Sequence, residues 1–321
     1  MSELNILDVG HGNCAVLTNG GVLVIDAGRS TSLLEFLEHE HIRKVDVVLL
    51  SHADADHIGG LMKLIASGLF EVGLVRLNAD ASKDSKLWDD LIWLLSTTPE
   101  IDFQVALTTA DVASYSTGNI DVEVLAPSTY LAGKSAGSVD RKGRRLTSNS
   151  NSVVVRLSVD GTPCVLLPGD IDLVGLHNLL EDGKACNARV VVFPHHGGLP
   201  GGADVVEFTE EFCKQTQAEV IIFSIGRANV DTPRPELVEA VRRILPDAKI
   251  LCTQLSVHCS EAVAPTQDHL LNKFAQGRAK SLCCGGTLTL NLDSPTSVVL
   301  PEKEHAEFVQ INAPTALCSR K

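Results

Sequence analysis

LLSHADADHIGGL, residues 49–61, carries the strongest structural signal in this chain. Two histidines and two aspartates stand between an apolar run and a Gly-Gly pair. The preceding VDVVLLS (45–51) predicts a buried strand, and residues 58–67 predict a helix with Asp56 at its N-cap. Side chains between a strand and a helix meet at the carboxyl edge of a sheet, where imidazole and carboxylate groups favour a metal site. A single His-x-Asp pair would more often be a solvated turn.

The composition is that of a globular protein with an acidic surface. Its 321 residues suffice for one large domain or two smaller ones, and a hydrophobic content of 44% supports a large core. The formal net charge of −13 argues against a generally basic surface, so any contact with nucleic acid must be local. The N-terminus has no signal-peptide pattern and no apolar run reaches the roughly 20 residues of a membrane span. We therefore expect a cytoplasmic protein without membrane insertion.

The order of predicted elements indicates an α/β fold built from two similar halves. Short apolar runs at 4–28 predict a β meander, and strands then alternate with helices up to residue 96. A hairpin that turns at Asp160-Gly161 begins the second half, where strands and helices alternate again up to residue 253. Two such halves predict two sheets face to face with helices outside, a four-layer αββα sandwich.

Further motifs follow in an order that resembles the metallo-β-lactamase fold. Residues 52–57 are similar to its HxHxDH signature. The other motifs are DVGHGNCAVL (8–17), VIDAG (24–28), SNSNSVVVRL (148–157), VLLPGDI (165–171), VVFPHHGG (191–198) and IIFSIG (221–226). Together they resemble the subgroup typified by the C-terminal domain of the competence protein ComEC. We assign residues 1–253 to this metallohydrolase domain and 254–321 to a Cys-containing extension that completes or packs on the second sheet.

The resemblance implies a site for two divalent ions. The residues implied as ligands are His52, Asp54, Asp56, His57, Asp170, His195 and His196. Within the 52–57 loop, the first two would bind one ion and the last two the other. Where many members have a middle histidine, this chain has Asn149, Asn151 and Ser152. The first site is then rich in oxygen ligands, which favours Mn²⁺ or Mg²⁺, while the second would hold Zn²⁺ or Mn²⁺.

The expected division of labour within the site also follows from the resemblance. Asp170 would bridge the two ions, because a carboxylate has two oxygens. Either His195 or His196 would complete the cluster, and the other would donate a hydrogen bond to substrate. Asp56, His196 and Asn151 are the expected catalytic residues, with Asn151 positioning substrate or water. His11 and Asn13 stand where the subgroup usually has Gln and Asp, and either a supporting contact to a ligand or loop packing would explain them.

Water activated by two metal ions implies a hydrolase, and three functions are consistent with that chemistry. The resemblance implies a phosphodiesterase or nuclease acting on nucleic acid. One alternative is a small-molecule hydrolase of a lactam, lactone or thioester. The other is a partner-regulated effector subunit of a multi-protein complex, for instance a defence complex. For the nuclease, substrate contacts are expected from Arg141, Lys142, Arg144, Arg145, Ser224 and Arg227. The basic run is equally typical of a solvated loop. Partner proteins are expected because the chain lacks the membrane channel of ComEC; the sequence does not set the oligomeric state.

The C-terminal region is rich in cysteine. A structural zinc site at Cys252, Cys259, Cys283 and Cys284 is one interpretation. Buried reduced thiols are the alternative, because no C-x2-C pair is present among them. GGTLTLNL (285–292) and SVVLP (297–301) predict a terminal β-hairpin.

Overall fold

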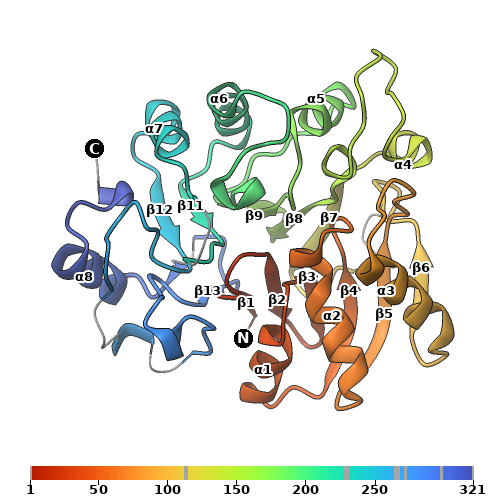
Figure 1. Ribbon diagram of the computed structural model, residues 1–321, viewed down its shortest axis with the longest axis horizontal. Coiled ribbons are helices and arrows are strands. Elements are labelled where there is room, and N and C mark those ends of the chain that lie inside the picture. The colour runs from red at the N-terminus through yellow and green to blue at the C-terminus, as the bar shows by residue number, and fades with distance from the viewer. Residues whose placement is uncertain are drawn as a thin grey trace.

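Two β-sheets pack face to face, and helices cover their outer faces (Figure 1). The computed structural model describes residues 2–111, 115–227, 231–263, 268–270, 273–296 and 299–319. Aliphatic side chains from both sheets form the central core. Separate cores lie between each sheet and its helices. The predicted four-layer αββα architecture is confirmed.

The first sheet joins the N-terminal meander to parallel strands. In spatial order its strands are β14 (Val299–Leu300), β13 (Leu288–Asn291), β1 (Glu3–Ile6), β2 (Cys14–Thr18), β3 (Val22–Ala27), β4 (Lys44–Leu49), β5 (Glu71–Leu77) and β6 (Asp102–Val105). Pairing is antiparallel from β14 to β3 and parallel from β3 to β6.

The second sheet repeats this pattern. Its order is β12 (Lys249–Cys252), β11 (Val220–Phe223), β10 (Val190–Val192), β9 (Thr162–Leu167), β8 (Val154–Val159) and β7 (Ile120–Ala126). The β7–β8–β9 meander is antiparallel, and β9 to β12 run parallel. The predicted hairpin at Asp160-Gly161 joins β8 to β9.

The helices form the two outer layers. Helices α1 (Ser32–His39), α2 (Ala55–Ser67) and α3 (Lys86–Thr97) pack on the first sheet. Helices α5 (Leu173–Glu181), α6 (Val205–Thr216), α7 (Pro235–Ile244) and α8 (Lys303–Asn312) pack on the second, and the short α4 (Thr129–Lys134) follows β7. Within the described residues, no helix combines the length and apolar character needed to cross a bilayer.

Two expectations differ from the structure. The first helix after the metal-capable loop begins at Ala55 with Asp54 as its N-cap, so Asp56 lies in the first turn rather than at the cap. The C-terminal hairpin β13–β14 extends the first sheet through β1, whereas the extension had been expected on the second. Other parts of the extension do pack against the second sheet's outer core: Leu255, Cys259, Cys284, and α8 with the residues after it. A domain boundary at residue 253 stays a prediction.

The Gly-Gly pair of the loop is explained by packing. A Cβ on Gly60 would lie 1.9 Å from the carbonyl oxygen of Ala27, at the end of β3. Only glycine therefore allows the start of α2 to lie directly on this strand end. The close approach brings the acidic and imidazole groups of the loop to the carboxyl ends of the parallel strands.

Candidate metal centre

The predicted ligands meet where parallel strands of both sheets end. His52 follows β4, Asp170 follows β9, and His195 and His196 follow β10. His57 lies in the first turns of α2. The carboxyl ends of parallel strands share one edge, which is why residues far apart in sequence converge here.

One carboxylate oxygen lies at the centre of this group. Asp170 Oδ2 is 3.5 Å from His57 Nε2, 3.7 Å from His195 Nδ1 and 3.7 Å from His196 Nε2. The other oxygen, Oδ1, accepts a hydrogen bond from the His195 backbone N–H at 3.0 Å. The Asp170 N–H itself donates to Ser152 Oγ at 3.0 Å, so the Asn/Ser-rich stretch helps to fix this carboxylate.

Two of the imidazoles are oriented by groups behind them. His57 Nδ1 lies 2.7 Å from Asp26 Oδ2, and His196 Nδ1 lies 2.9 Å from the Ser224 carbonyl oxygen. Because both partners accept hydrogen bonds, each Nδ1 carries a proton, and a neutral ring would turn the Nε2 lone pair toward the centre. Burial opposes a charge on His57, but Asp26 and Asp170 raise its pKa well above the usual range, so a bound cation would replace its Nε2 proton. Asp26 was missed as a site residue, although the VIDAG motif contains it; the signal was a carboxylate at the end of an apolar strand.

The backbone at the His-His pair is strained. His195 and His196 have φ values of 53° and 54°, in the left-handed region that costs a non-glycine residue about 1–2 kcal/mol. Such strain persists where the surroundings enforce it, typically at functional sites. Here it turns both imidazoles toward Asp170.

The structure groups the ligand atoms into two sets, each with atoms within 4.8 Å of one another. One set is His52, His57 and Asp170; the other is His11, Asp56 and His196. The Nε2 atoms of His52, His57, His195 and His196 are buried without a hydrogen-bond partner. Buried polar atoms without partners are costly, so converging imidazole lone pairs beside carboxylates fit divalent cations. This grouping separates Asp56 from His57, which had been expected to share an ion.

Protonation states suit that role. Burial alone would raise the pKa of Asp170, but the three surrounding imidazoles hold it well below its usual range. The interaction with His52 lowers the pKa of Asp54 to about 2. Burial, reinforced by the adjacent His196, lowers the pKa of His11 to about 4. These carboxylates are therefore ionised and His11 neutral near pH 7, the forms that bind metal.

Residues 7–109, which contain the 52–57 loop, match the model of the metallo-beta-lactamase superfamily. This match covers about the first third of the chain. No curated protein matches the chain. Together with the two sets of ligand atoms, this match supports a metal-dependent hydrolase.

Several solved structures are similar to the chain. Igni18, a metallo hydrolase from the archaeon Ignicoccus hospitalis, is 16% identical with a TM-score of 0.44, over 77% of this chain and 94% of that one. Tm1679, a metal-dependent hydrolase of the beta-lactamase superfamily, is 16% identical with a TM-score of 0.46, over 78% and 95%. A diphosphatase of the PhnP family is 12% identical with a TM-score of 0.45, over 78% and 94%.

Asp54, at the position where many superfamily members have histidine, has a partner that the sequence did not reveal. Its Oδ2 lies 3.7 Å from His52 Nε2, and its Oδ1 forms an ion pair with Lys83. Lys83 comes from the loop after β5, so only the tertiary structure brings it here. An ammonium on this carboxylate competes with a cation for its charge, which weakens the expectation of an oxygen-rich first site.

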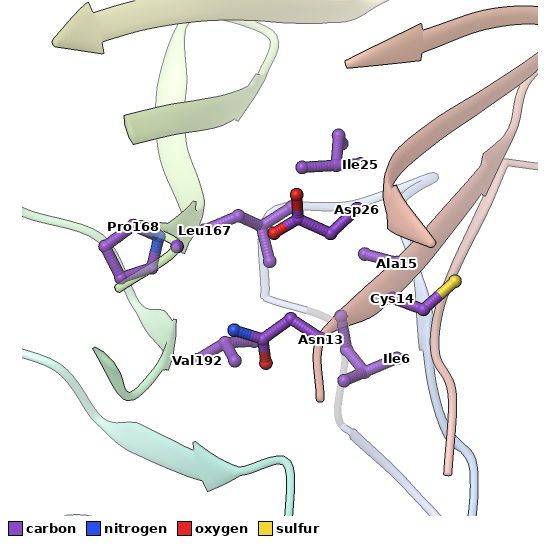
Figure 2. Close-up of a pocket in the computed structure, with 10 residues that line it drawn as sticks. Ile6, Asn13, Cys14, Ala15, Ile25, Asp26, Leu167, Pro168 and Val192 are labelled. Carbon is purple, nitrogen blue, oxygen red and sulfur yellow. The ribbon is translucent and has the colours of Figure 1, made fainter. Parts of the chain in front are cut away.

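The amides predicted near the site are buried beside it. A cavity of about 20 Å³ lies between the sheets below the centre. Figure 2 shows the Asp26 carboxylate and the Asn13 side chain at this cavity, opposite Leu167 and Pro168. Asn13 Oδ1 and Asn151 Oδ1 are buried without a hydrogen-bond partner.

The predicted substrate-binding cations divide into two kinds. Arg144 donates to Asp140 at 2.6 Å and to both oxygens of Glu181 at 2.9 and 3.0 Å. Lys142 donates to the same Glu181 at 2.9 Å. These contacts fasten the basic segment, residues 134–145, to α5. Arg144 and Lys142 therefore hold the protein together here, in place of the expected contact with phosphate.

Arg141 and Arg145 remain exposed. The basic segment lies beside the loop 78–85, because Ser148 donates to a carboxylate of that loop. The same loop carries Lys83, which contacts Asp54. The two exposed arginines thus belong to a segment that neighbours the loop carrying Lys83.

Ser224 and Arg227 have structural contacts instead of the expected contacts with substrate. Ser224 is fully buried, and its Oγ donates to the Gly12 carbonyl at 2.6 Å. The Arg227 guanidinium donates to the carbonyl oxygens of residues 255, 256 and 260 at 2.6–3.0 Å. Ser224 therefore positions two parts of the site, the His196 ring and the loop before β2.

The predicted thiol site does not assemble. Cys283 Sγ lies 3.1 Å from an Asp8 oxygen, and Cys284 Sγ lies 3.1 Å from His305 Nε2. Cys252, Cys259, Cys284 and Cys318 line one enclosed cavity, which we call the thiol cluster. In the described part of the chain, no three of these sulfur atoms come within 4.8 Å of one another. The structure thus favours the alternative of buried thiols.

Proposed function

We propose that this protein is a metal-dependent phosphodiesterase that cleaves nucleic acid. The observation that carries the proposal is the contact of one Asp170 oxygen with three imidazole nitrogens at 3.5–3.7 Å. A carboxylate ringed by imidazoles suits a bridge between two divalent ions. Ions held there would supply the positive charge that polarises a phosphodiester and acidifies water.

We assign the roles of the chain's residues from their contacts. His196 ligates through Nε2, because its Nδ1–H is held by the Ser224 carbonyl. His195 lies outside both ligand sets, so it is the histidine left to hydrogen-bond the substrate. Asn151 Oδ1, a buried acceptor without a partner, would orient a water or substrate that reaches it. Asp56 and Asp170 remain ionised and would hold the cations.

Charge supports a phosphate polymer as the substrate. A chain of net charge −13 repels nucleic acid except where cations gather. Arg141 and Arg145 are exposed on the segment beside the loop that carries Lys83, whereas Lys142 and Arg144 are paired with Asp140 and Glu181. Binding to separate partner proteins stays a proposal that follows from the sequence.

The test joins metal analysis to a substrate panel. Metal-loaded protein is assayed against bis-p-nitrophenyl phosphate, single- and double-stranded DNA, RNA and a chromogenic lactam. We expect hydrolysis of the small phosphodiester and of at least one nucleic acid. Cleavage of the lactam alone would replace this proposal with a small-molecule hydrolase.

The guiding role of the basic segment has a sharper test. Arg141→Ala with Arg145→Ala should raise KM for DNA and reduce the salt dependence of binding by about one to two ion equivalents. Hydrolysis of bis-p-nitrophenyl phosphate should be unchanged. The matched control is Lys63→Ala with Lys214→Ala, which removes the same charge from exposed positions on α2 and α6. Equal effects of the two double variants on DNA would refute the local role.

A further inference from the structure

The loop between β1 and β2 is held directly over the start of α2. The Asn13 N–H donates to the Asp56 carbonyl oxygen at 3.2 Å. A Cβ on Gly12 would lie 2.4 Å from that same oxygen, so glycine permits the approach. Ser224 Oγ fixes the loop from the other side through the Gly12 carbonyl at 2.6 Å. His11 is therefore carried to the metal centre by a braced backbone.

The His11 imidazole lies among the ligand atoms. Its Nε2 is 3.6 Å from Asp56 Oδ2, and its ring centroid is 4.3 Å from that of His196. His196 Nε2 is itself 3.3 Å from Asp56 Oδ2. Ligands at about 2.0–2.2 Å from one zinc ion in tetrahedral geometry are themselves about 3.3–3.6 Å apart. The spacing of Asp56 from both imidazoles is of this size.

We infer that His11 is a direct ligand of the ion held by Asp56 and His196. This inference rests on the proposed two-metal site and adds a residue to it. With the Asp170 bridge, the ion would then have two imidazoles and two carboxylates, and its two nitrogen donors would favour Zn²⁺ more than an all-oxygen site would. His57 is left to the neighbouring ion with His52 and Asp170, as the atom groups indicate.

The first experiment replaces His11 with glutamine, which keeps a polar side chain of similar reach. Zn²⁺ binding is measured by competition with a chromophoric chelator, and Co²⁺ is substituted to record its visible absorption. His11→Gln should weaken one of two Zn²⁺ sites at least about tenfold and leave the other unchanged. The Co²⁺ bands of that site should shift because a nitrogen ligand is lost. His39→Gln, on the exposed end of α1, is the matched control.

Chemical rescue separates ligation from support. In His11→Gly, added imidazole should restore the lost Zn²⁺ affinity and the Co²⁺ spectrum, because it can occupy the vacated position. If wild type binds two ions and His11→Gln binds both with unchanged affinity and spectrum, His11 is not a ligand and the proposed function stands. If wild type binds no metal, the proposed function itself fails.

Discussion

The metal centre and the thiol cluster both gather metal-capable side chains from distant parts of the chain. They differ in the protonation state of those side chains and in whether their lone pairs have partners within the protein. At the metal centre, Asp170 is ionised and four imidazole Nε2 atoms are buried without partners. In the thiol cluster, burial raises the pKa of Cys252 and Cys284 well above the usual range. Thiols rather than thiolates therefore line that cavity, and a thiol is a poor metal ligand.

A metal site therefore requires more than metal-capable residue types, because their side chains must also be oriented. Asp26 and the Ser224 carbonyl orient His57 and His196 by binding the Nδ1 atoms, which face away from the centre. In the thiol cluster, the contact of Cys284 with His305 is satisfied within the protein. Each prediction below sets one region against the other.

The largest effect is expected at the shared carboxylate. Asp170→Ala should remove most bound metal and hydrolytic activity, because three imidazoles lose the charge that they surround. Cys252→Ser, the control in the thiol cluster, should keep the wild-type metal content. Metal is counted by elemental analysis after dialysis. If Cys252→Ser loses an ion or Asp170→Ala keeps both ions, the assignment of the metal site to the metal centre is wrong.

A smaller loss of metal affinity is expected when Asp26, which contacts His57 from the side away from the metal centre, is replaced. Asp26→Asn removes the charge that holds the His57 proton on Nδ1, so metal affinity should fall roughly tenfold to a hundredfold. Asp46→Asn is a matched control, since Asp46 also accepts a backbone N–H, that of Val22, but at the surface of β4. Chelator competition measures both. Equal affinities for the two variants would show that the orientation of His57 is not what prepares the site.

The smallest effect concerns acid stability beside the thiol cluster. Burial, with His269 and Lys249 nearby, lowers the pKa of His305 from 6.5 to about 4. The unfolded chain then binds this proton more tightly, so the stability that His305 contributes is present above about pH 6.5 and is lost as pH falls toward 4. Between pH 7 and pH 5, the free energy of unfolding should therefore fall by about 2 kcal/mol less in His305→Gln than in wild type. Urea unfolding with EDTA present measures this difference without contribution from the metal centre. Parallel pH profiles for variant and wild type would contradict it.

Local patterns predicted most of the elements. Residues 58–67 are helical as expected, within α2, and the hairpin at Asp160-Gly161 joins β8 to β9 as expected. Periodicity and turn residues act over a few positions, so one sequence carries them. The N-cap lies two residues earlier than expected, at Asp54 in place of Asp56.

The sequence by itself determined the ligand types, their position after apolar strands and the four-layer architecture, because these depend on local spacing and on the burial of apolar faces. Only the tertiary structure decided which partners they meet. Lys83 reaches Asp54 from another loop, Glu181 neutralises Arg144 and Lys142, and His11 lies against Asp56. Such contacts depend on the path of the chain through both sheets, and no local pattern encodes a distance between side chains that are far apart in sequence.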